Sequence, residues 1–217
     1  MTPFLKPTQL SQYKGVLIDL DNTLYLHDPC HNAAIKAVYD YAKDAGLVNE
    51  IDSFNAGYQI GRKAVQKRLF PQGVCRSRLL YFQAMLDAMG HSEKLSEALE
   101  MESCYKAAFL ANMTLDTDAH AFLKQCKDAD IPVCVVTNLN TQFQIQKLQA
   151  LDIMPYVSYL VTSEEAGVEK PEPAIFELAL SKMDMSVHDV VMIGDDKEKD
   201  SKGAEQLGIT AVTIELC

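Results

Sequence analysis

Two carboxylates, Asp19 and Asp21, follow directly after the short apolar run Val16-Leu17-Ile18. If the strand that this run predicts continues through them, their side chains point to one face, about 6 to 7 Å apart at about 3.3 Å per residue. Two negative charges at this separation repel each other unless a cation lies nearby. We therefore interpret the segment as a candidate reaction or metal site rather than as a requirement of the fold.

A second acidic cluster, at residues 195–200, follows a later apolar run. A calcium loop of the EF-hand type requires Gly at its sixth position and Glu at its twelfth. Counted from Asp19, these positions hold Leu24 and Cys30, and the second cluster has Gln206 at its twelfth position. Neither cluster is a calcium loop of this kind, so we expect one acidic site assembled from distant segments.

The elements that must position these acids are indicated by short runs rich in β-branched residues. Helix-like stretches separate the last four runs, which is the pattern of a parallel sheet. Continuous apolar strands are typical of a sheet that helices cover on both faces. The sequence thus predicts an α/β fold with an open, doubly wound parallel sheet. The expected strands are Val16–Asp19, Pro132–Thr137, Val157–Thr162, Val190–Ile193 and Thr210–Ile214.

More than a hundred residues separate the first expected strand from the second, which is far longer than an ordinary connection. This stretch lacks strand-like runs and has apolar residues at helical spacing, for example between Leu79 and Met89. We expect four helices there, near residues 32–45, 52–69, 75–90 and 93–110. The domain prediction is therefore an α/β catalytic core of residues 1–27 and 113–217, with an all-helical cap of residues 28–112.

Composition narrows the class of protein further. The chain has 217 residues, of which 48% are hydrophobic and 23% charged, as is typical of a globular protein. Its net charge of −10 argues against a nucleic-acid partner, which would need clustered Lys and Arg. There is no apolar stretch of the roughly 18 residues that a membrane span needs, and no signal-peptide layout. We expect a cytoplasmic protein without membrane or nucleic-acid partners, and nothing indicates its oligomeric state.

Polar residues also follow the later strands. Thr137-Asn138 ends the second, Lys170 lies downstream of the third, and Gly194-Asp195 ends the fourth. Taken alone, Thr137-Asn138 is equally well a helix cap, and Lys170 an exposed loop charge. However, ligands bind beyond the carboxyl ends of parallel strands, so all of these residues are candidates for the site that contains Asp19.

In this order the residues resemble the four motifs of the haloacid dehalogenase superfamily. The motifs are D-x-D-x-T at Asp19 to Thr23, a hydroxyl at Thr137, a lysine at Lys170, and G-D-x-x-x-x-D at Gly194 to Asp200. The insertion after the first motif is similar to the helical-cap subgroup, which contains phosphatases, dehalogenases and mutases. The resemblance covers the chain on both sides of the insertion.

The resemblance implies a role for each matched residue. Asp19 is expected to attack phosphorus and form an aspartyl-phosphate. Asp21 is expected to act as the general acid and base, which requires it to begin protonated beside an ionised neighbour. Thr137, the backbone amide of Asn138, and Lys170 are expected to bind the phosphoryl oxygens.

A metal site is implied as well. Mg²⁺ prefers oxygen ligands, and the expected ligands are Asp19, the backbone carbonyl of Asp21, and Asp195. Asp200 is expected to lie next to these ligands and to support them without binding the metal itself. Asp196 either adds a ligand or only interacts with its own loop.

The function predicted from these features is Mg²⁺-dependent hydrolysis of a small phosphorylated metabolite, such as a sugar phosphate, phosphoglycolate or a nucleoside monophosphate. Asp21 favours phosphoryl transfer over dehalogenation, because a halide leaving group needs no proton. A sugar-phosphate mutase, a 2-haloacid dehalogenase and a non-catalytic phosphate- or metal-binding protein remain alternatives. Arg76 and Arg78 follow Gly73 in the insertion. We hypothesise that one of these two arginines reaches the substrate.

Overall fold

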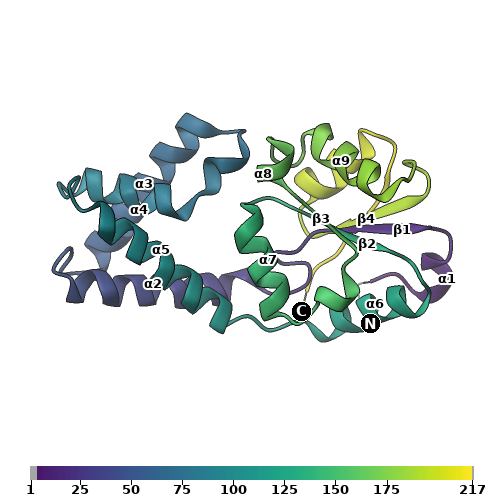
Figure 1. The fold of residues 1–217 in the computed structure, drawn as a ribbon, viewed down its shortest axis with the longest axis horizontal. Helices are drawn as coiled ribbons and strands as arrows, with labels where there is room; N and C mark the ends of the chain where they lie inside the picture. Colours follow the sequence, from purple (N-terminus) through teal and green to yellow (C-terminus); the bar gives the residue numbers. More distant parts are fainter. Residues whose placement is uncertain (1–3, 217) are drawn as a thin grey trace. The chain divides into compact units, whose positions relative to one another are not determined.

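The computed structural model describes residues 4–216 and contains a parallel sheet of five strands (Figure 1). The strand order is β3-β2-β1-β4-β5, and each neighbouring pair is parallel. This topology confirms the predicted α/β class. The strands are β1 (Gly15–Ile18), β2 (Val133–Thr137), β3 (Tyr159–Thr162), β4 (Val190–Gly194) and β5 (Thr210–Thr213).

Helices cover both faces of this sheet, with α8 and α9 on one side and α6 and α7 on the other (Figure 1). Every residue of β1, β2 and β4 is buried, which explains why these strands are apolar without alternation. Ile175 and Phe176 of α9 pack into a cluster with Val136 and Val161 of the sheet. These elements are α1 (Pro7–Leu10), α6 (Thr117–Asp128), α7 (Thr141–Ala150), η2 (Met154–Tyr156), α8 (Ser163–Ala166), α9 (Pro173–Met183), the π-helical turn η3 (Lys197–Lys202) and α10 (Gly203–Glu205).

The chain divides into two compact units. One, the core unit, comprises the chain up to His27 together with the chain from Met113 onward, and the other, the helical unit, comprises Asp28–Asn112. The helical unit is built from α2 (His27–Asp44), α3 (Ile51–Leu69), η1 (Gly73–Arg76), α4 (Arg78–Ala88) and α5 (Leu95–Ala111). Across residues 4–216, no helix combines the length and the apolar character that crossing a membrane requires.

The helical unit differs from the sequence prediction at two helix starts: its first helix begins at His27 rather than near residue 32, and its third begins at Arg78 rather than near residue 75. The segment before it forms the short 3₁₀ turn η1, and the Ser77 side chain caps α4 by accepting the N–H of Leu80 at 3.4 Å. Helices α3 and α4 pack closely, because a Cβ atom at Gly61 would lie 2.4 Å from the carbonyl oxygen of Tyr81.

Candidate active site

The strand that leads to the first acidic pair ends one residue earlier than predicted. β1 stops at Ile18, and the chain then turns, with Asn22 in the left-handed region at φ 61°. The Asn22 side chain stabilises this turn by accepting the N–H of His27 at 2.9 Å. Strand alternation therefore does not extend through Asp19 and Asp21, and each of these carboxylates pairs with a different lysine.

Lys170 is the partner of Asp19. Its buried ammonium donates to Oδ1 of Asp19 and to Oδ1 of Asp200, both at 2.6 Å, and to the carbonyl oxygen of Val136 at 2.8 Å. These bonds use all three donors of the ammonium group. Burial opposes the charge, but Asp19 and Asp200 together raise the pKa of Lys170 above its ordinary value. The lysine therefore stays charged and lies between two carboxylates that would otherwise repel each other.

Asp19, Asp195 and Asp200 form an acidic cluster at the ends of β1 and β4. One carboxylate oxygen from each lies within 4.8 Å of the others. Burial, reinforced by Asp200 and Asp21 and opposed by Lys170, raises the pKa of Asp19 to about 8. Burial and Asp200 also raise the pKa of Asp195. Because the donors are all hard oxygens and their charges repel, the cluster fits a divalent cation such as Mg²⁺.

The third member of this cluster is held by its own loop. Oδ2 of Asp200 accepts the N–H of Asp196 at 3.1 Å, while its other oxygen is bonded to Lys170. The close approach explains Gly194, because a Cβ atom there would lie 2.2 Å from Oδ2 of Asp200. By contrast, the side-chain hydrogen bond that Asp195 accepts from the hydroxyl of Thr23 is long, at 3.4 Å. Asp195 is thus the more available ligand of the two.

Asp196 is engaged within the same loop. Its Oδ1 accepts the N–H groups of Glu198 and Lys199, both at 3.0 Å, and its other oxygen pairs with the Lys199 ammonium. Burial opposes the charged form, but the bonds to Lys199 lower the pKa of Asp196 overall. These contacts stabilise the turn η3.

Asp21 has a separate set of partners. Oδ1 of Asp21 accepts a 2.7 Å bond from the buried ammonium of Lys147 and a bond from the Tyr25 hydroxyl. Burial disfavours the charged carboxylate, yet Lys147 and then His27 lower the pKa of Asp21 overall. With the protein's own charges alone, Asp19 is therefore the more readily protonated of the two acids. Asp21 can act as the acid only if it is the more readily protonated of the two. A cation beside Asp19 would favour that order, because it would lower the pKa of Asp19.

The end of β2 supplies hydrogen-bonding groups next to this site. The amide nitrogen of the fully buried Gln144 donates to the hydroxyl oxygen of Thr137 at 2.6 Å and to the carbonyl oxygen of Asn138 at 3.3 Å. Since Thr137 accepts this bond, its own hydroxyl proton is directed to another acceptor. The Asn138 side chain accepts the N–H of Lys170 at 2.8 Å, which links the ends of the second and third motifs.

Sequence reasoning missed Lys147 and Gln144. Both lie on α7, three residues apart and so on one face of the helix, and both are buried. The signal that would have revealed them is a lysine and a glutamine at core positions of the helix that follows Thr137. A buried lysine requires a partner, and the nearest candidates were the two acids after β1.

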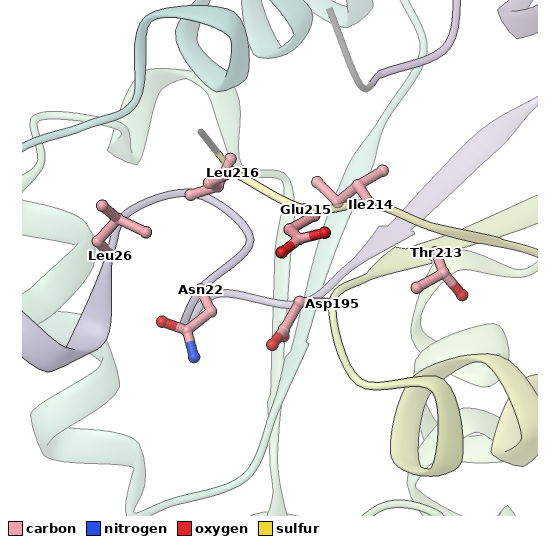
Figure 2. Close-up of a pocket in the computed structure, with 7 residues that line it drawn as sticks. All are labelled: Asn22, Leu26, Asp195, Thr213, Ile214, Glu215 and Leu216. Atoms are coloured by element: carbon pink, nitrogen blue, oxygen red, sulfur yellow. The ribbon is translucent and has the colours of Figure 1, made fainter.

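A pocket of about 500 Å³ adjoins Asp195 within the core unit (Figure 2). It is lined by Asn22, Leu26, Asp195, Thr213, Ile214, Glu215 and Leu216. Figure 2 shows the carboxylates of Asp195 and Glu215, the amide of Asn22 and the hydroxyl of Thr213 as its polar groups, with leucine and isoleucine side chains as its apolar ones. Among residues 4–216, no lysine, arginine or histidine lines the pocket, so it suits neutral or cationic groups better than anionic ones.

The remaining two candidates from the sequence, Arg76 and Arg78, belong to the helical unit. Arg76 ends η1 and Arg78 begins α4. The structure thus brings Asp19, Asp195 and Lys170 together in the core unit, whereas the two arginines lie in the other unit.

A parallel sheet with an acidic, lysine-containing site at its strand ends is typical of α/β proteins that bind a ligand there. A family model described as haloacid dehalogenase-like hydrolase matches residues 13–208. The chain therefore belongs to the haloacid dehalogenase-like hydrolases.

Several relatives in this family are phosphatases. The chain is 36% identical over 201 residues to a ribulose-1,5-bisphosphate 5-phosphatase of Halopiger xanaduensis, covering 93% of this chain and 84% of the relative. It is 28% identical over 206 residues to a glyceraldehyde 3-phosphate phosphatase of Methanocaldococcus jannaschii, covering 93% of this chain and 84% of the relative.

Solved structures share the fold. The HAD-hydrolase YfnB of Bacillus subtilis, bound to magnesium, matches with a TM-score of 0.70 and 18% identity, covering 92% of this chain and 87% of that one. A 2-haloacid dehalogenase of Pseudomonas syringae pv. Tomato DC3000 matches with a TM-score of 0.72 and 23% identity, covering 92% and 85%. At this level of identity the likeness shows the fold alone.

Proposed function

We propose that this hydrolase is a Mg²⁺-dependent phosphatase that acts on a small phosphorylated metabolite, with the core unit as its catalytic domain and the helical unit as its cap. The observation that carries the proposal is the buried Lys170, bonded at 2.6 Å to both Asp19 and Asp200 beside Asp195. In this proposal Asp19 is the nucleophile, Lys170 supplies a fixed positive charge, and Asp19 and Asp195 are metal ligands. The phosphatase names of the relatives support the same reaction.

In the proposed first step, a carboxylate oxygen of Asp19 attacks phosphorus while the bond from phosphorus to the leaving oxygen breaks. Asp21 gives its proton to that oxygen, so the product leaves as an alcohol. Lys170 and the hydroxyl of Thr137, together with the amide of Asn138, stabilise the charge on the phosphoryl oxygens. Water then attacks phosphorus and gives its proton to Asp21, which releases inorganic phosphate and restores Asp19.

The donor set fits a magnesium ion held by Asp19, Asp195 and the backbone carbonyl of Asp21. When bound, the ion neutralises charge on the nucleophile and the phosphoryl group, so that two anions can approach each other. Asp200 fixes Lys170 from behind these ligands, and Asp196 stabilises the loop that carries Asp195.

Lys147 and Gln144 act as positioning residues in this scheme. The Lys147 ammonium, 2.7 Å from Asp21 and 5.1 Å from the centre of the Phe143 ring, holds the Asp21 carboxylate in one orientation. Gln144 holds the Thr137 hydroxyl so that its proton points to a phosphoryl oxygen. Both residues lie on α7, so one helix orients the acid and the hydroxyl together.

The substrate class follows from the second carboxylate and from the relatives. Asp21 suits an alkoxide leaving group, which needs a proton, better than a halide, which does not. The relatives are named for phosphates of sugars and of a sugar-derived aldehyde, so we place sugar phosphates ahead of phosphoglycolate and nucleoside monophosphates. Transfer to a second sugar, as in a mutase, uses the same groups and differs only in the acceptor.

The test is phosphate release from a panel of sugar phosphates, sugar bisphosphates, phosphoglycolate and nucleoside monophosphates. Each compound is assayed with Mg²⁺, with a chelator, and with the Asp19→Asn variant. We expect release that requires Mg²⁺ and is lost in the variant. Isomerised sugar phosphate without free phosphate would indicate a mutase, and halide release from 2-haloacids would indicate a dehalogenase.

A further inference from the structure

Ser163, the first residue of α8, bonds to both backbone groups of one residue in another loop of the core unit. The serine is fully buried, and its hydroxyl accepts the N–H of Leu139 at 2.9 Å and donates to the carbonyl oxygen of Leu139 at 3.4 Å. The N–H of Glu164 donates to the same carbonyl oxygen at 3.3 Å. The start of α8 therefore fixes the N–H and the C=O of Leu139 together.

Leu139 has a backbone conformation that leucine rarely adopts. Its φ is 151°, and a positive φ is sterically unfavourable for a residue with a bulky side chain. Glycine would adopt this φ without the same penalty, but the side chain of Leu139 is buried, which favours an apolar residue at this position. A residue keeps such a conformation only when its surroundings hold it there. The bonds from Ser163 and Glu164 to Leu139 provide that restraint.

The restrained residue directly follows the two groups proposed to bind the phosphoryl oxygens. The Asn138 side chain is fixed on both sides, because it accepts the N–H of Lys170 at 2.8 Å and donates to the carbonyl oxygen of Lys170 at 3.3 Å. The backbone N–H of Asn138, by contrast, has no hydrogen-bond partner among residues 4–216. The hydroxyl of Thr137 accepts a bond from Gln144 and keeps its own proton for another acceptor. Two donors that a ligand can use thus precede Leu139.

We propose that Ser163 is a positioning residue for the phosphoryl-binding segment, residues 137–139. By holding Leu139 at its unfavourable φ, the Ser163 hydroxyl keeps the Thr137 hydroxyl and the Asn138 amide pointing at a phosphoryl oxygen. This inference rests on the proposed function, in which those two donors stabilise the phosphoryl group. Ser163 itself contacts no substrate atom in this scheme. Donors that are oriented in advance stabilise developing charge better than donors that must first reorient.

The first test removes the Ser163 hydroxyl. Without it, Leu139 can relax toward a negative φ and displace the two donors that precede it. We expect Ser163→Ala to lower kcat for a sugar phosphate about tenfold and to weaken the binding of inorganic phosphate, measured by calorimetry with Mg²⁺, about fivefold. The control is Ser186→Ala, which removes an exposed hydroxyl bonded to Asp189 before β4 and should change both values less than about twofold.

A double-mutant cycle separates positioning from general support of the structure. Leu139→Gly and Leu139→Ala both remove the buried leucine side chain, but only glycine adopts the observed φ without strain. We therefore expect Ser163→Ala to weaken phosphate binding about fivefold in the Leu139→Ala background and less than about twofold in the Leu139→Gly background. Equal losses in the two backgrounds would contradict the role of the strained backbone.

Amide hydrogen exchange tests the restraint without substrate or turnover. The N–H of Leu139 is bonded to Ser163, so we expect it to exchange at least about tenfold faster in Ser163→Ala than in wild type, as followed by NMR. The N–H of Val135, in the middle of β2, is the internal control and should exchange at the same rate in both proteins. If Ser163→Ala does not fold, Ser163→Cys repeats the test with a thiol, which forms weaker hydrogen bonds.

Each combination of results decides the proposal. Faster exchange at Leu139 together with weaker phosphate binding supports it. Faster exchange with unchanged phosphate binding and unchanged kcat would overturn it, because the restraint would then not orient the donors. Unchanged exchange would overturn its first step, and a wild type that binds no phosphate would remove the ligand that it assumes.

Failure of this inference differs from failure of the proposed function. If wild type binds phosphate but releases none from any ester, the phosphatase assignment fails, while phosphate binding and amide exchange still test Ser163. If wild type releases phosphate and Ser163→Ala matches it in kcat and in phosphate binding, only the role of Ser163 is wrong.

Discussion

The two units differ in the partners of their buried positive charges. In the core unit, Lys170 lies between Asp19 and Asp200, and Lys147 is bonded to Asp21, so each of these ammonium groups faces a carboxylate within 2.7 Å. In the helical unit, the guanidinium of Arg78 bonds to the carbonyl oxygen of Arg76 and to Tyr105, and it lies near the rings of Tyr81 and Tyr105. Among residues 4–216, the two lysines thus have carboxylate partners, whereas Arg78 has only neutral ones.

This contrast indicates that the two units have different roles. The core unit carries groups whose protonation and orientation suit chemistry at phosphorus. The helical unit carries a cation, Arg78, that is enclosed by tyrosine rings and paired only with neutral groups among residues 4–216. The predictions below alter one charge at a time, so each one either strengthens this comparison or removes its basis.

The largest effect is expected from Lys170→Met. Removing the ammonium leaves Asp19 and Asp200 close together without their shared partner, so we expect kcat to fall about 10³-fold and the free energy of unfolding to fall by about 3–5 kcal/mol. Assays of phosphate release and denaturant titrations measure the two quantities. Lys182→Met is the matched control, since it breaks a partly exposed pair with Glu165 and a bond to the carbonyl oxygen of Leu160, and it should change stability by about 1 kcal/mol. Retained activity in Lys170→Met would remove the basis for its proposed role.

Lys147→Met should have the next largest effect, and it should depend on the leaving group. Without the ammonium, the Asp21 carboxylate loses its fixed orientation, so protonation of a poor leaving group becomes inefficient. We expect kcat to fall about 10²-fold for a sugar phosphate but much less for p-nitrophenyl phosphate, whose leaving group needs little help.

The control for this change is Lys124→Met, which removes an exposed lysine paired with Asp128 in the core unit. Equal losses for both substrates in Lys147→Met would mean that the lysine supports the structure rather than the acid.

Asp19→Asn should change stability in a pH-dependent way. Because the pKa of Asp19 is raised from 3.8 to about 8, the folded protein keeps a proton between about pH 4 and 8 that the unfolded chain releases. The carboxylate therefore lowers stability progressively as pH rises through this window.

We expect Asp19→Asn, with a chelator present, to be more stable than wild type at pH 8 by a few kcal/mol, and the gap to shrink toward pH 5. Each kcal/mol corresponds to a melting temperature change of about 2–4 °C at this chain length. The exposed carboxylate variant Asp52→Asn serves as the control and should show no such pH-dependent gap. A gap that stays constant or widens toward pH 5 would contradict the raised pKa of Asp19.

The smallest effect is expected from Arg78→Met. The variant loses the ring contacts of Arg78 and its bonds to the Arg76 carbonyl oxygen and to Tyr105, but it also removes a desolvated cation, so the free energy of unfolding should fall by only about 1–2 kcal/mol. Denaturant titration measures the change. A loss as large as that of Lys170→Met would show that the two units do not differ in the way described.

The fold was predictable because its signals are local. Short apolar runs marked each strand of the parallel sheet, and the long stretch without such runs predicted an all-helical insertion. Helix boundaries were less accurate at Arg78, where a cap at Ser77 and a 3₁₀ turn compete with an apolar helical pattern.

The site was only partly predictable, for physical reasons. Asp19, Lys170 and Asp195 follow strands of a parallel sheet, so topology alone brings them together. Lys147 and Gln144 are buried on a helix face, and no strand-end rule points to them. The opposing pKa shifts of Asp19 and Asp21 depend on which lysine each acid contacts, which sequence spacing does not reveal.

The most direct test of the central claim is to detect the aspartyl-phosphate itself. Wild type and Asp21→Asn are incubated with substrate and Mg²⁺, quenched in acid, digested and analysed by mass spectrometry, with Asp19→Asn as the control. We expect phosphate on the peptide that contains Asp19, more of it in Asp21→Asn, where the intermediate is hydrolysed slowly, and none in Asp19→Asn. Two results would contradict the assignment of Asp19 as the nucleophile. One is turnover by wild type with no phosphate on that peptide in either wild type or Asp21→Asn, and the other is phosphate on a different residue.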